Sequence, residues 1–262
     1  MNSSDGLVLV IGGNGKIGKS FCLSVLKITN YCIINIDPSL DSYIQENIYD
    51  KKRKKYLHIP IPIGNLEAAE KITKTIKESF PRGKINSIIN LSRVNINKNE
   101  EIIFCENDAI KNINVQILGL NYLIDQLINK NNFKDFSIVH AGSLNSRLVS
   151  HQSVLYHYLK GAIESASKAL AFKLAKHNVR SNVIICGLIK DPSLKLSKEQ
   201  LKIEKEAIPL SSGPATLDDV RNLILFLINP ESRSITGTSF VIDAGMSLPD
   251  SYTVLSNLND FN

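Results

Sequence analysis

Short hydrophobic runs alternate with longer amphipathic segments along the whole chain. Six of the runs are rich in β-branched residues, and they span residues 7–11, 32–36, 87–91, 136–139, 182–185 and 239–242. Their hydrophobicity is nearly continuous rather than alternating, which is typical of strands that are buried on both faces. The pattern therefore predicts the strands of a parallel sheet that is covered on both sides.

The segments between these runs carry the spacing of amphipathic helices. Asn65 is a good N-cap, and the apolar residues after it lie along one side of a helix that ends at Pro81 and Gly83. Residues 111–128 and 155–176 have the same character. This alternation predicts an α/β fold, in which helices cover both faces of a doubly wound parallel sheet. Ligands of such sheets bind at the carboxyl ends of the strands, where the strand order reverses.

The composition fits an ordinary globular chain. Of the 262 residues, 43% are hydrophobic and 21% are charged, and an α/β chain of this length commonly folds as one unit. The formal net charge of +6 could attract an anionic substrate or cofactor. The one dense basic cluster, residues 51–55, has no interleaved aromatic residues and no zinc-ligand spacing. A solvated loop is therefore favoured over a nucleic-acid contact.

Cysteine usage and hydropathy predict a soluble, cytoplasmic protein that does not enter a membrane. The cysteines Cys22, Cys32, Cys105 and Cys186 are far apart and form no Cys-x-x-Cys pair, which favours a reducing compartment. The N-terminus has no signal-peptide pattern. The longest apolar runs span about seven residues, whereas a membrane-spanning helix needs ~18.

A glycine-rich turn directly follows the first predicted strand and leads into a helical pattern. Its residues are Gly12, Gly13, Asn14, Gly15, Lys16, Ile17 and Gly18. Glycines there allow a tight turn, a close approach of the backbone to a pyrophosphate and close packing of helix on strand. The helix N-terminus offers N–H groups and a partial positive charge to the phosphates. An ordinary tight turn is the alternative, but the place between strand and helix favours a dinucleotide site.

Asp37 closes the second predicted strand, about twenty residues beyond the glycine-rich turn. A carboxylate at this place can accept hydrogen bonds from the ribose hydroxyls of the adenosine and would repel a 2′-phosphate, which favours NAD over NADP. Two alternatives stay open. Asp37 and Pro38 could simply begin a turn, and Lys16, Lys19 or the basic run 51–55 could accommodate a 2′-phosphate.

A serine, a tyrosine and a lysine have the spacing of a proton-transfer site. Ser143 follows the strand predicted over 136–139, at its carboxyl end. Tyr156 and Lys160 are four residues apart, so on a helix they project from the same face. A free phenol ionises only near pH ~10, and a nearby ammonium group stabilises the phenolate, so such a pair can supply an acid and base. A tyrosine and a lysine four residues apart also occur by chance, so Ser143 is needed to support the assignment of a proton-transfer site.

In this order, the motifs resemble the short-chain dehydrogenase/reductase family over nearly the whole chain. The family's active-site asparagine, serine, tyrosine and lysine fall on Asn114, Ser143, Tyr156 and Lys160. Residues 179–183 resemble the strand before the family's substrate loop, and residues 237–245 resemble its C-terminal strand and turn.

The resemblance implies a hydride transfer between nicotinamide C4 and the carbon of a secondary alcohol or ketone. Tyr156 would be the general acid and base. Lys160 would stabilise its phenolate and bind the nicotinamide ribose, Ser143 would orient the substrate, and Asn114 would position a water that links Lys160 to solvent. The fold would be a single Rossmann-type domain over residues 1–262 with a parallel seven-stranded sheet.

The implied cofactor is NAD, with NADP left open, and no metal takes part. Besides the glycine-rich turn, the expected cofactor contacts are Asp37, Ile63, Asn90, Leu91, Ser92, Tyr156, Lys160, Gly187 and Ile189. Some positions depart from the family pattern. Its Asn-Asn-Ala-Gly after the fourth strand is here Asn90-Leu91-Ser92-Arg93, and its Pro-Gly before the substrate loop is Cys186-Gly187. These departures bear on the cofactor contacts and remove no catalytic group.

The remaining expectations concern the substrate and the assembly. Residues 190–213 are polar and poorly patterned for a core, which favours a lid over the substrate, although an inert insertion would look similar. The family resemblance implies a homo-oligomer, a dimer or a tetramer. The basic balance favours a sugar or sugar-nucleotide substrate over a fatty-acyl ketone. Two other classes stay open: a nucleotide-sensing or scaffold protein without catalysis, and an extended-type epimerase or dehydratase, which the length disfavours.

Overall fold

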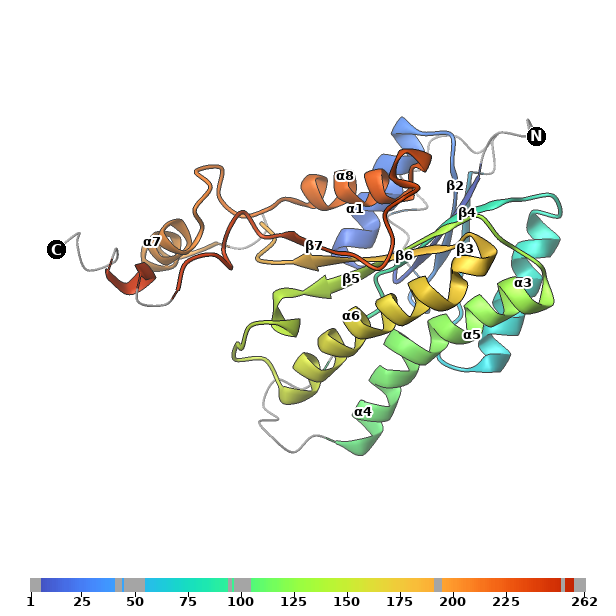
Figure 1. Ribbon diagram of the computed structural model, residues 1–262, viewed down its shortest axis with the longest axis horizontal. Helices are drawn as coiled ribbons and strands as arrows, with labels where there is room; N and C mark the ends of the chain where they lie inside the picture. The colour runs from blue at the N-terminus through green and yellow to red at the C-terminus, as the bar shows by residue number, and fades with distance from the viewer. Residues whose placement is uncertain are drawn as a thin grey trace.

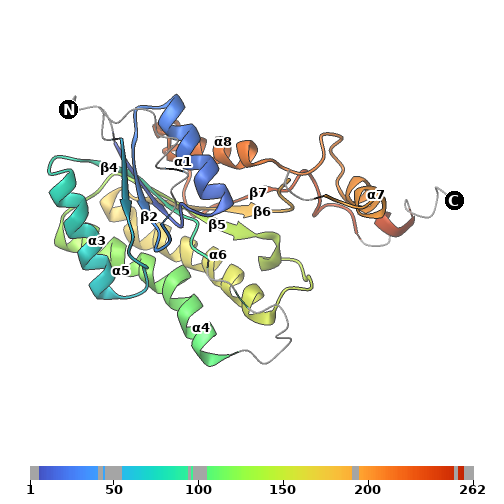
Figure 2. The ribbon, with the colours of Figure 1, turned by 180° about the vertical axis from the view of Figure 1, so that it is seen from behind.

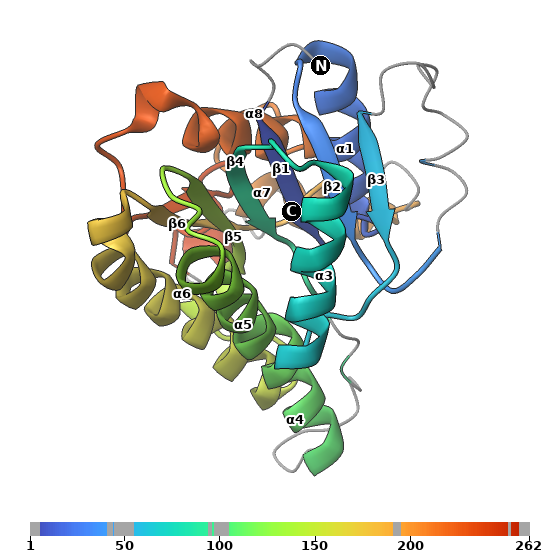
Figure 3. The same ribbon diagram turned by 90° about the vertical axis from the view of Figure 1, so that its right-hand side faces the viewer.

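The fold is built on one all-parallel sheet of seven strands in the order β3-β2-β1-β4-β5-β6-β7 (Figure 1). It is seen in a computed structural model that describes residues 6–40, 44, 55–93, 96, 105–190, 195–250 and 253–256. The strands are β1 (Leu7–Ile11), β2 (Cys32–Ile36), β3 (Tyr56–Ile59), β4 (Ile85–Asn90), β5 (Ser137–Ser143), β6 (Arg180–Cys186) and β7 (Ser239–Ile242). Figure 3 shows the row of strands from β3 to β6 nearly edge-on. The predicted fold class is confirmed.

Six of the seven strands lie where the hydrophobic runs predict them. The runs 7–11, 32–36 and 239–242 coincide with β1, β2 and β7, and the other three differ by a few residues at their ends. The strand that the pattern misses is β3. It has only four residues, three of them partly exposed, and His58 interrupts the hydrophobic run in its sequence Tyr-Leu-His-Ile.

Helices cover both faces of the sheet (Figures 1 and 2). One face carries α1 (Lys16–Ile28) and α8 (Leu217–Ile228), and the other carries α3 (Leu66–Ser79), α5 (Gly119–Asp125) and α6 (Val154–Leu174). As predicted, Asn65 caps α3: its side-chain oxygen accepts the Ala68 N–H at 2.8 Å. The remaining helices, α4 (Glu106–Ile113) and α7 (Lys198–Ala207), lie further from the sheet, with α7 at the left of Figure 1.

The helix predicted over 111–128 belongs to a longer helical stretch with two π-helical segments. It runs from α4 through η1 (Asn114–Leu118), α5 and η2 (Gln126–Lys130). In η1 the Gly119 N–H donates to the Asn114 carbonyl five residues earlier. Short π segments of this kind are frequent at functional sites, and η1 lies next to the residues that matter below. Short 3₁₀ turns follow β5, α6 and α8: η3 (Leu144–Ser146), η4 (Ala175–His177) and η5 (Pro230–Ser232).

Two hydrophobic clusters hold the layers together, one on each face of the sheet. Leu7, Leu9 and Ile11 of β1 join the cluster that includes the helices α3 and α5, whereas Val8 and Val10 join the cluster that includes α1 and α8. Successive side chains of a strand point to opposite faces, so a strand covered on both sides must be hydrophobic at every position. This explains the continuous runs in the sequence.

The strand order reverses between β1 and β4, which lie side by side at the centre of the sheet. The glycine-rich turn follows β1 and the segment Asn90-Leu91-Ser92-Arg93 follows β4, so both meet at the carboxyl edge of the sheet. Of the basic cluster 51–55, only Lys55 is among the described residues. Within the described parts of the chain, no helix combines the length and the apolar character needed to cross a membrane.

Candidate active site

The glycine-rich turn between β1 and α1 leaves no room for a side chain at Gly12 or Gly18. Gly12 has a φ of +80°, and a Cβ there would come 2.9 Å from the carbonyl oxygen of Leu91 on the neighbouring segment. A Cβ on Gly18 would lie 2.6 Å from the backbone of Gly13. Both contacts require glycine, the first for the backbone conformation and the second for packing of helix against turn.

The helix α1 begins without a side-chain cap. Its N-cap is Gly15, and its first turn contains no acidic residue. The N–H groups of a first helical turn need acceptors from outside the helix, and together with the helix dipole they form an anion-binding site. The turn therefore has the features that a cofactor pyrophosphate requires: a backbone cradle that a Cβ would fill and an uncapped helix N-terminus.

The carboxylate of Asp37 is buried at the end of β2 and is engaged by this chain's own groups. One oxygen accepts the Asn14 N–H at 3.0 Å, and the other accepts the N–H of Ser39 at 3.0 Å and its hydroxyl at 2.6 Å. Asp37 therefore begins a turn, and it also holds the glycine-rich turn in place. A carboxylate offers about four acceptor positions, so, counting the partners among the described residues, one remains for a ribose hydroxyl.

Asn90 and Ser92 connect the end of β4 to η1. The Asn90 side-chain oxygen accepts the Ser92 hydroxyl at 2.7 Å, and its NH₂ group donates to the carbonyl oxygen of Gln116 at 3.3 Å. Both side chains are buried and turned into the protein. Leu91 between them is partly buried in the cluster with α1 and α8, and its carbonyl contacts Gly12. Any contact of this segment with a cofactor would therefore use mainly its backbone.

The other expected cofactor residues, Ile63, Gly187 and Ile189, differ in what they contact. Ile63 is a buried core residue, so its side chain serves packing. Gly187 follows β6, and a Cβ there would lie 2.5 Å from the Asp243 side chain. Ile189 pairs with Ala215 through an isolated bridge beyond the end of β6.

Tyr156 and Lys160 come together at the start of α6. Ser153 caps this helix by accepting the Tyr156 N–H at 3.3 Å. The Lys160 ammonium nitrogen lies 5.5 Å from the centroid of the Tyr156 ring. Ser143 is the last residue of β5, and its Oγ accepts the Asn145 N–H at 3.2 Å. This places a hydroxyl at the carboxyl edge of the sheet, where the expected site lies.

Lys160 is almost completely buried, with 6% of its surface exposed. Its ammonium donates to the side-chain oxygen of Gln116 at 3.4 Å and to the Ala141 carbonyl at 3.5 Å. The pKa of Lys160 is lowered to about 8, chiefly by burial and also by the positive charge of Arg93, while Cys186 acts in the opposite direction. Lys160 is thus a cation at neutral pH but one that titrates in an accessible range.

Gln116, and not Asn114, contacts Lys160 within the described residues. The Gln116 amide is fixed at both ends, because its NH₂ group donates to the side-chain oxygen of Asn112 at 2.8 Å. Asn112 in turn donates to the Asp108 carbonyl at 2.9 Å. Sequence reasoning missed Gln116, although a signal existed: residues 112, 116 and 120 share one face of the helical stretch, and Leu120 is a core residue.

Arg93 is a second residue that sequence reasoning did not place in the site. It follows β4, and its guanidinium carbon lies 5.9 Å from the centroid of the Tyr156 ring. Arg93 is exposed, whereas Lys160 is buried. Two cations from different elements therefore lie near the same phenol.

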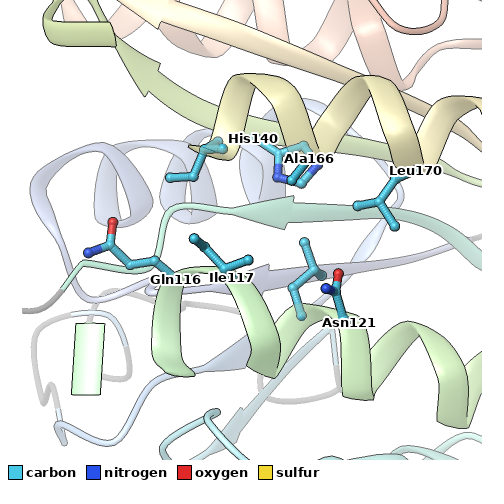
Figure 4. Close-up of a pocket in the computed structure, with 8 residues that line it drawn as sticks. Gln116, Ile117, Asn121, His140, Ala166 and Leu170 are labelled. Carbon is cyan, nitrogen blue, oxygen red and sulfur yellow. The ribbon is translucent and has the colours of Figure 1, made fainter. Parts of the chain in front are cut away.

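A small pocket lies behind this site, between the helical stretch η1–α5, β5 and α6 (Figure 4). It is lined by Gln116, Ile117, Leu120, Asn121, His140, Ile163, Ala166 and Leu170. His140 is buried and one of its ring nitrogens lies 3.1 Å from the Ser181 hydroxyl, which also contacts Ser167. Burial lowers the pKa of His140 to about 4, so it is neutral at physiological pH. The pocket is part of the packing behind Lys160.

The fold and the site together define a class of protein. A parallel doubly wound sheet carries a glycine-rich turn at its switch point, and a buried lysine beside a tyrosine lies at the same edge. These are the features of a Rossmann-type oxidoreductase.

Comparisons with known proteins identify the family. A family model described as enoyl-(acyl carrier protein) reductase matches residues 32–247. The chain is 27% identical over 264 residues to an L-xylulose reductase of Caenorhabditis elegans, a match that covers 93% of this chain and 96% of the relative. The chain belongs to the short-chain dehydrogenase/reductase family of NAD(P)-dependent oxidoreductases.

Two solved structures show the same fold. A 4-hydroxyisoleucine dehydrogenase complexed with NADH superposes with a TM-score of 0.77 at 21% identity, over 94% of this chain and 100% of the other. ElxO with NADP bound superposes with a TM-score of 0.76 at 22% identity, over 92% of this chain and 98% of the other.

Proposed function

We propose that this protein transfers a hydride between NAD(H) and a secondary alcohol or ketone, with Tyr156 as the general acid and base. The observation that carries the proposal is the buried Lys160 ammonium 5.5 Å from the Tyr156 ring, at the edge of the sheet where the glycine-rich turn also lies. When bound, the cofactor supplies the hydride chemistry at its nicotinamide C4. The protein's own residues move the proton and align the reactants.

Tyr156 donates its hydroxyl proton to the substrate oxygen during reduction and takes it back during oxidation. The positive charge of Lys160 favours the phenolate form of its neighbour, because opposite charges attract most strongly where water is excluded. Lys160 also binds the nicotinamide ribose in this proposal. Ser143 donates its hydroxyl hydrogen to the substrate oxygen and so orients the substrate.

Gln116 holds Lys160 in position in this proposal. The ammonium of a buried lysine needs acceptors, and Gln116 provides one that Asn112 fixes in turn. Asn114 keeps its expected part, the positioning of a water on the path from Lys160 to solvent. It lies at the first position of η1, with its side chain partly exposed.

For the cofactor we propose NAD, with NADP as the competitor. The turn Gly12–Gly18 would hold the pyrophosphate, and the remaining acceptor position of the Asp37 carboxylate would receive an adenosine ribose hydroxyl. The carboxylate would repel a 2′-phosphate at the same place. Ile63, Leu91, Gly187 and Ile189 would line the adenine and nicotinamide regions.

The substrate proposal is a sugar or a sugar derivative. The similarity to an L-xylulose reductase favours a polyhydroxylated substrate, and the net charge of +6 favours one with an anionic group. Residues 190–213, of which 191–194 lie outside the described residues, would form the lid over it. The proposal also includes one domain over residues 1–262, a homodimer or homotetramer, and the cytoplasm as location, which four free cysteines suit.

Steady-state turnover of a panel of sugars, polyols and their ketone forms with NAD(H) tests the proposal. Tyr156→Phe removes only the hydroxyl, so turnover should fall by roughly 10³-fold, whereas NADH should bind with unchanged affinity. Tyr122→Phe is the matched control, because Tyr122 packs against the core on α5 and should tolerate the change. A protein that only senses the nucleotide would be indifferent to both changes, and equal turnover by wild type and Tyr156→Phe would refute the assignment.

A further inference from the structure

We propose that Arg93 binds an anionic group of the substrate, a carboxylate or a phosphate, beside the Tyr156 hydroxyl. The inference rests on the proposed function and adds to it the chemical class of the substrate. Its basis is the position of the guanidinium at the mouth of the site, 5.9 Å from the centroid of the Tyr156 ring.

The position of Arg93 is set by the sheet. It comes three residues after the last residue of β4, the strand next to both β1 and β5. Its backbone is held there by the short segment in which Asn90 and Ser92 hydrogen-bond each other and Asn90 reaches the Gln116 carbonyl. The side chain therefore extends from a fixed base across the carboxyl edge of the sheet to α6.

Within the described residues, Arg93 has no acidic partner. No carboxylate there forms an ion pair with it, and its charge acts on the like-charged Lys160. By contrast, Arg147 and Arg221 each pair with an acidic side chain. Two cations near one phenol repel each other, and an anion between them would remove that repulsion. A guanidinium also binds carboxylate and phosphate oxygens with two parallel hydrogen bonds.

The substrate is a better source of this anion than the cofactor. A cofactor pyrophosphate would lie on the glycine-rich turn and the N-terminus of α1, whereas Arg93 contacts the residue proposed to protonate the substrate. An oxygen hydrogen-bonded to the phenol lies about 2.7 Å from it, so a carboxylate or phosphate a few bonds from the reacting carbon comes within reach of the guanidinium. Sugar acids and sugar phosphates have this chemistry.

The test measures anion binding directly, by isothermal titration of wild type and Arg93→Gln with sodium acetate, inorganic phosphate and the neutral isostere acetamide. Each titration is done with and without NADH at constant ionic strength, because salt screens exposed charges. Arg82→Gln is the matched control, since Arg82 is also exposed but lies before β4, at the opposite end of the same strand.

We expect wild type and Arg82→Gln to bind at least one of the two anions at least tenfold more tightly than acetamide. Arg93→Gln should lose that preference at least tenfold while it binds NADH like wild type. Wild type without a preference for either anion, or Arg93→Gln with the preference intact, would overturn the inference. A parallel loss of NADH affinity in Arg93→Gln would overturn it too, by assigning Arg93 to the cofactor. Wild type that binds no NADH would instead refute the proposed function, and the titrations without NADH would still decide the role of Arg93.

Discussion

The glycine-rich turn and the region around Tyr156 form the two ends of the proposed site, and they use different parts of the chain. At the glycine-rich end, between β1 and α1, the proposed ligand contacts come from the backbone, and Gly12 and Gly18 serve by having no side chain. At the proposed catalytic end the contacts come from side chains, and these belong to separate elements: Arg93 after β4, Gln116 on η1 and Lys160 on α6. A backbone site is therefore local in the sequence, whereas a side-chain site is assembled only by the fold.

This difference gives each end its own response to mutation. Changes at the glycine-rich end should alter nucleotide binding and backbone strain. Changes at the catalytic end should alter turnover and proton equilibria, and they can even stabilise the protein, because a buried charge costs folding free energy.

After Tyr156→Phe, the largest effect is expected from Lys160→Met. Turnover should fall by roughly 10²–10³-fold, because the phenol loses the charge that assists proton transfer. The free energy of unfolding, by contrast, should rise in this variant. The pKa of Lys160 is about 8 in the folded protein against 10.5 for the free side chain, so a buried ammonium costs on the order of 3 kcal/mol below pH 8.

Urea denaturation at several pH values checks whether Lys160→Met is more stable than wild type. Between pH 8 and 10.5 the unfolded chain binds the proton and the folded protein does not, so wild-type stability rises with pH. The advantage of Lys160→Met should be greatest below pH 8 and should vanish by about pH 10.5. Lys168→Met, an exposed change on the same helix, should alter neither the turnover nor the free energy of unfolding.

The next largest effect, on stability and NADH affinity, is expected from Gly12→Ala in the glycine-rich turn. Alanine is strained at a φ of +80°, and its Cβ would meet the Leu91 carbonyl. We expect a loss of about 1–3 kcal/mol in unfolding free energy and at least a tenfold weaker affinity for NADH. Gly161→Ala is the control, since a Cβ there meets no atom within 4 Å and a helix interior favours alanine. Equal NADH binding by Gly12→Ala and wild type would contradict the backbone role of the turn.

A smaller effect is expected from Gln116→Met, which removes the acceptor from Lys160 but keeps the volume. The value of kcat should fall roughly tenfold, as one hydrogen bond to a charged group is worth about 1.5–3 kcal/mol at most, and the dissociation constant of NADH should change little. Gln126→Met is the control, because Gln126 is another buried glutamine of the same helical stretch, on η2. If both variants lose the same activity, the contact with Lys160 has no special role.

The smallest effect is expected from Asp37→Asn, which keeps the size of the side chain and removes its charge. The ratio of NADH to NADPH affinity should fall about tenfold, because the repulsion of a 2′-phosphate disappears. Asparagine keeps one acceptor oxygen, so it can keep the hydrogen bonds from Ser39 but loses the one from the Asn14 N–H. The readout is therefore the ratio of the two affinities and not either affinity alone. An unchanged ratio, measured by fluorescence titration, would show that Asp37 serves only the turn.

The sequence predicts the local features of the structure, and it does not predict the contacts that the fold assembles from distant segments. Continuous hydrophobic runs predict the central strands, because both faces of those strands are buried, whereas the short, partly exposed β3 contains His58 and has no such run. The glycine-rich turn and the Tyr156–Lys160 spacing are local patterns and could be read directly. The spacing of residues 112, 116 and 120 predicts a buried Gln116, but its contact with Lys160 depends on the packing of η1 against α6. Arg93 meets Tyr156 only because β4 ends and α6 begins at the same edge.

A fluorescence titration of the purified protein with NADH and NADPH tests the account most directly, since it needs no knowledge of the substrate. The account predicts saturable NADH binding in the micromolar range and clearly weaker NADPH binding, with the NADH affinity retained in Tyr156→Phe and lost in Gly12→Ala. Preferential NADPH binding would contradict the role of Asp37. Binding of neither nucleotide would contradict the assignment of the crevice as a dinucleotide site.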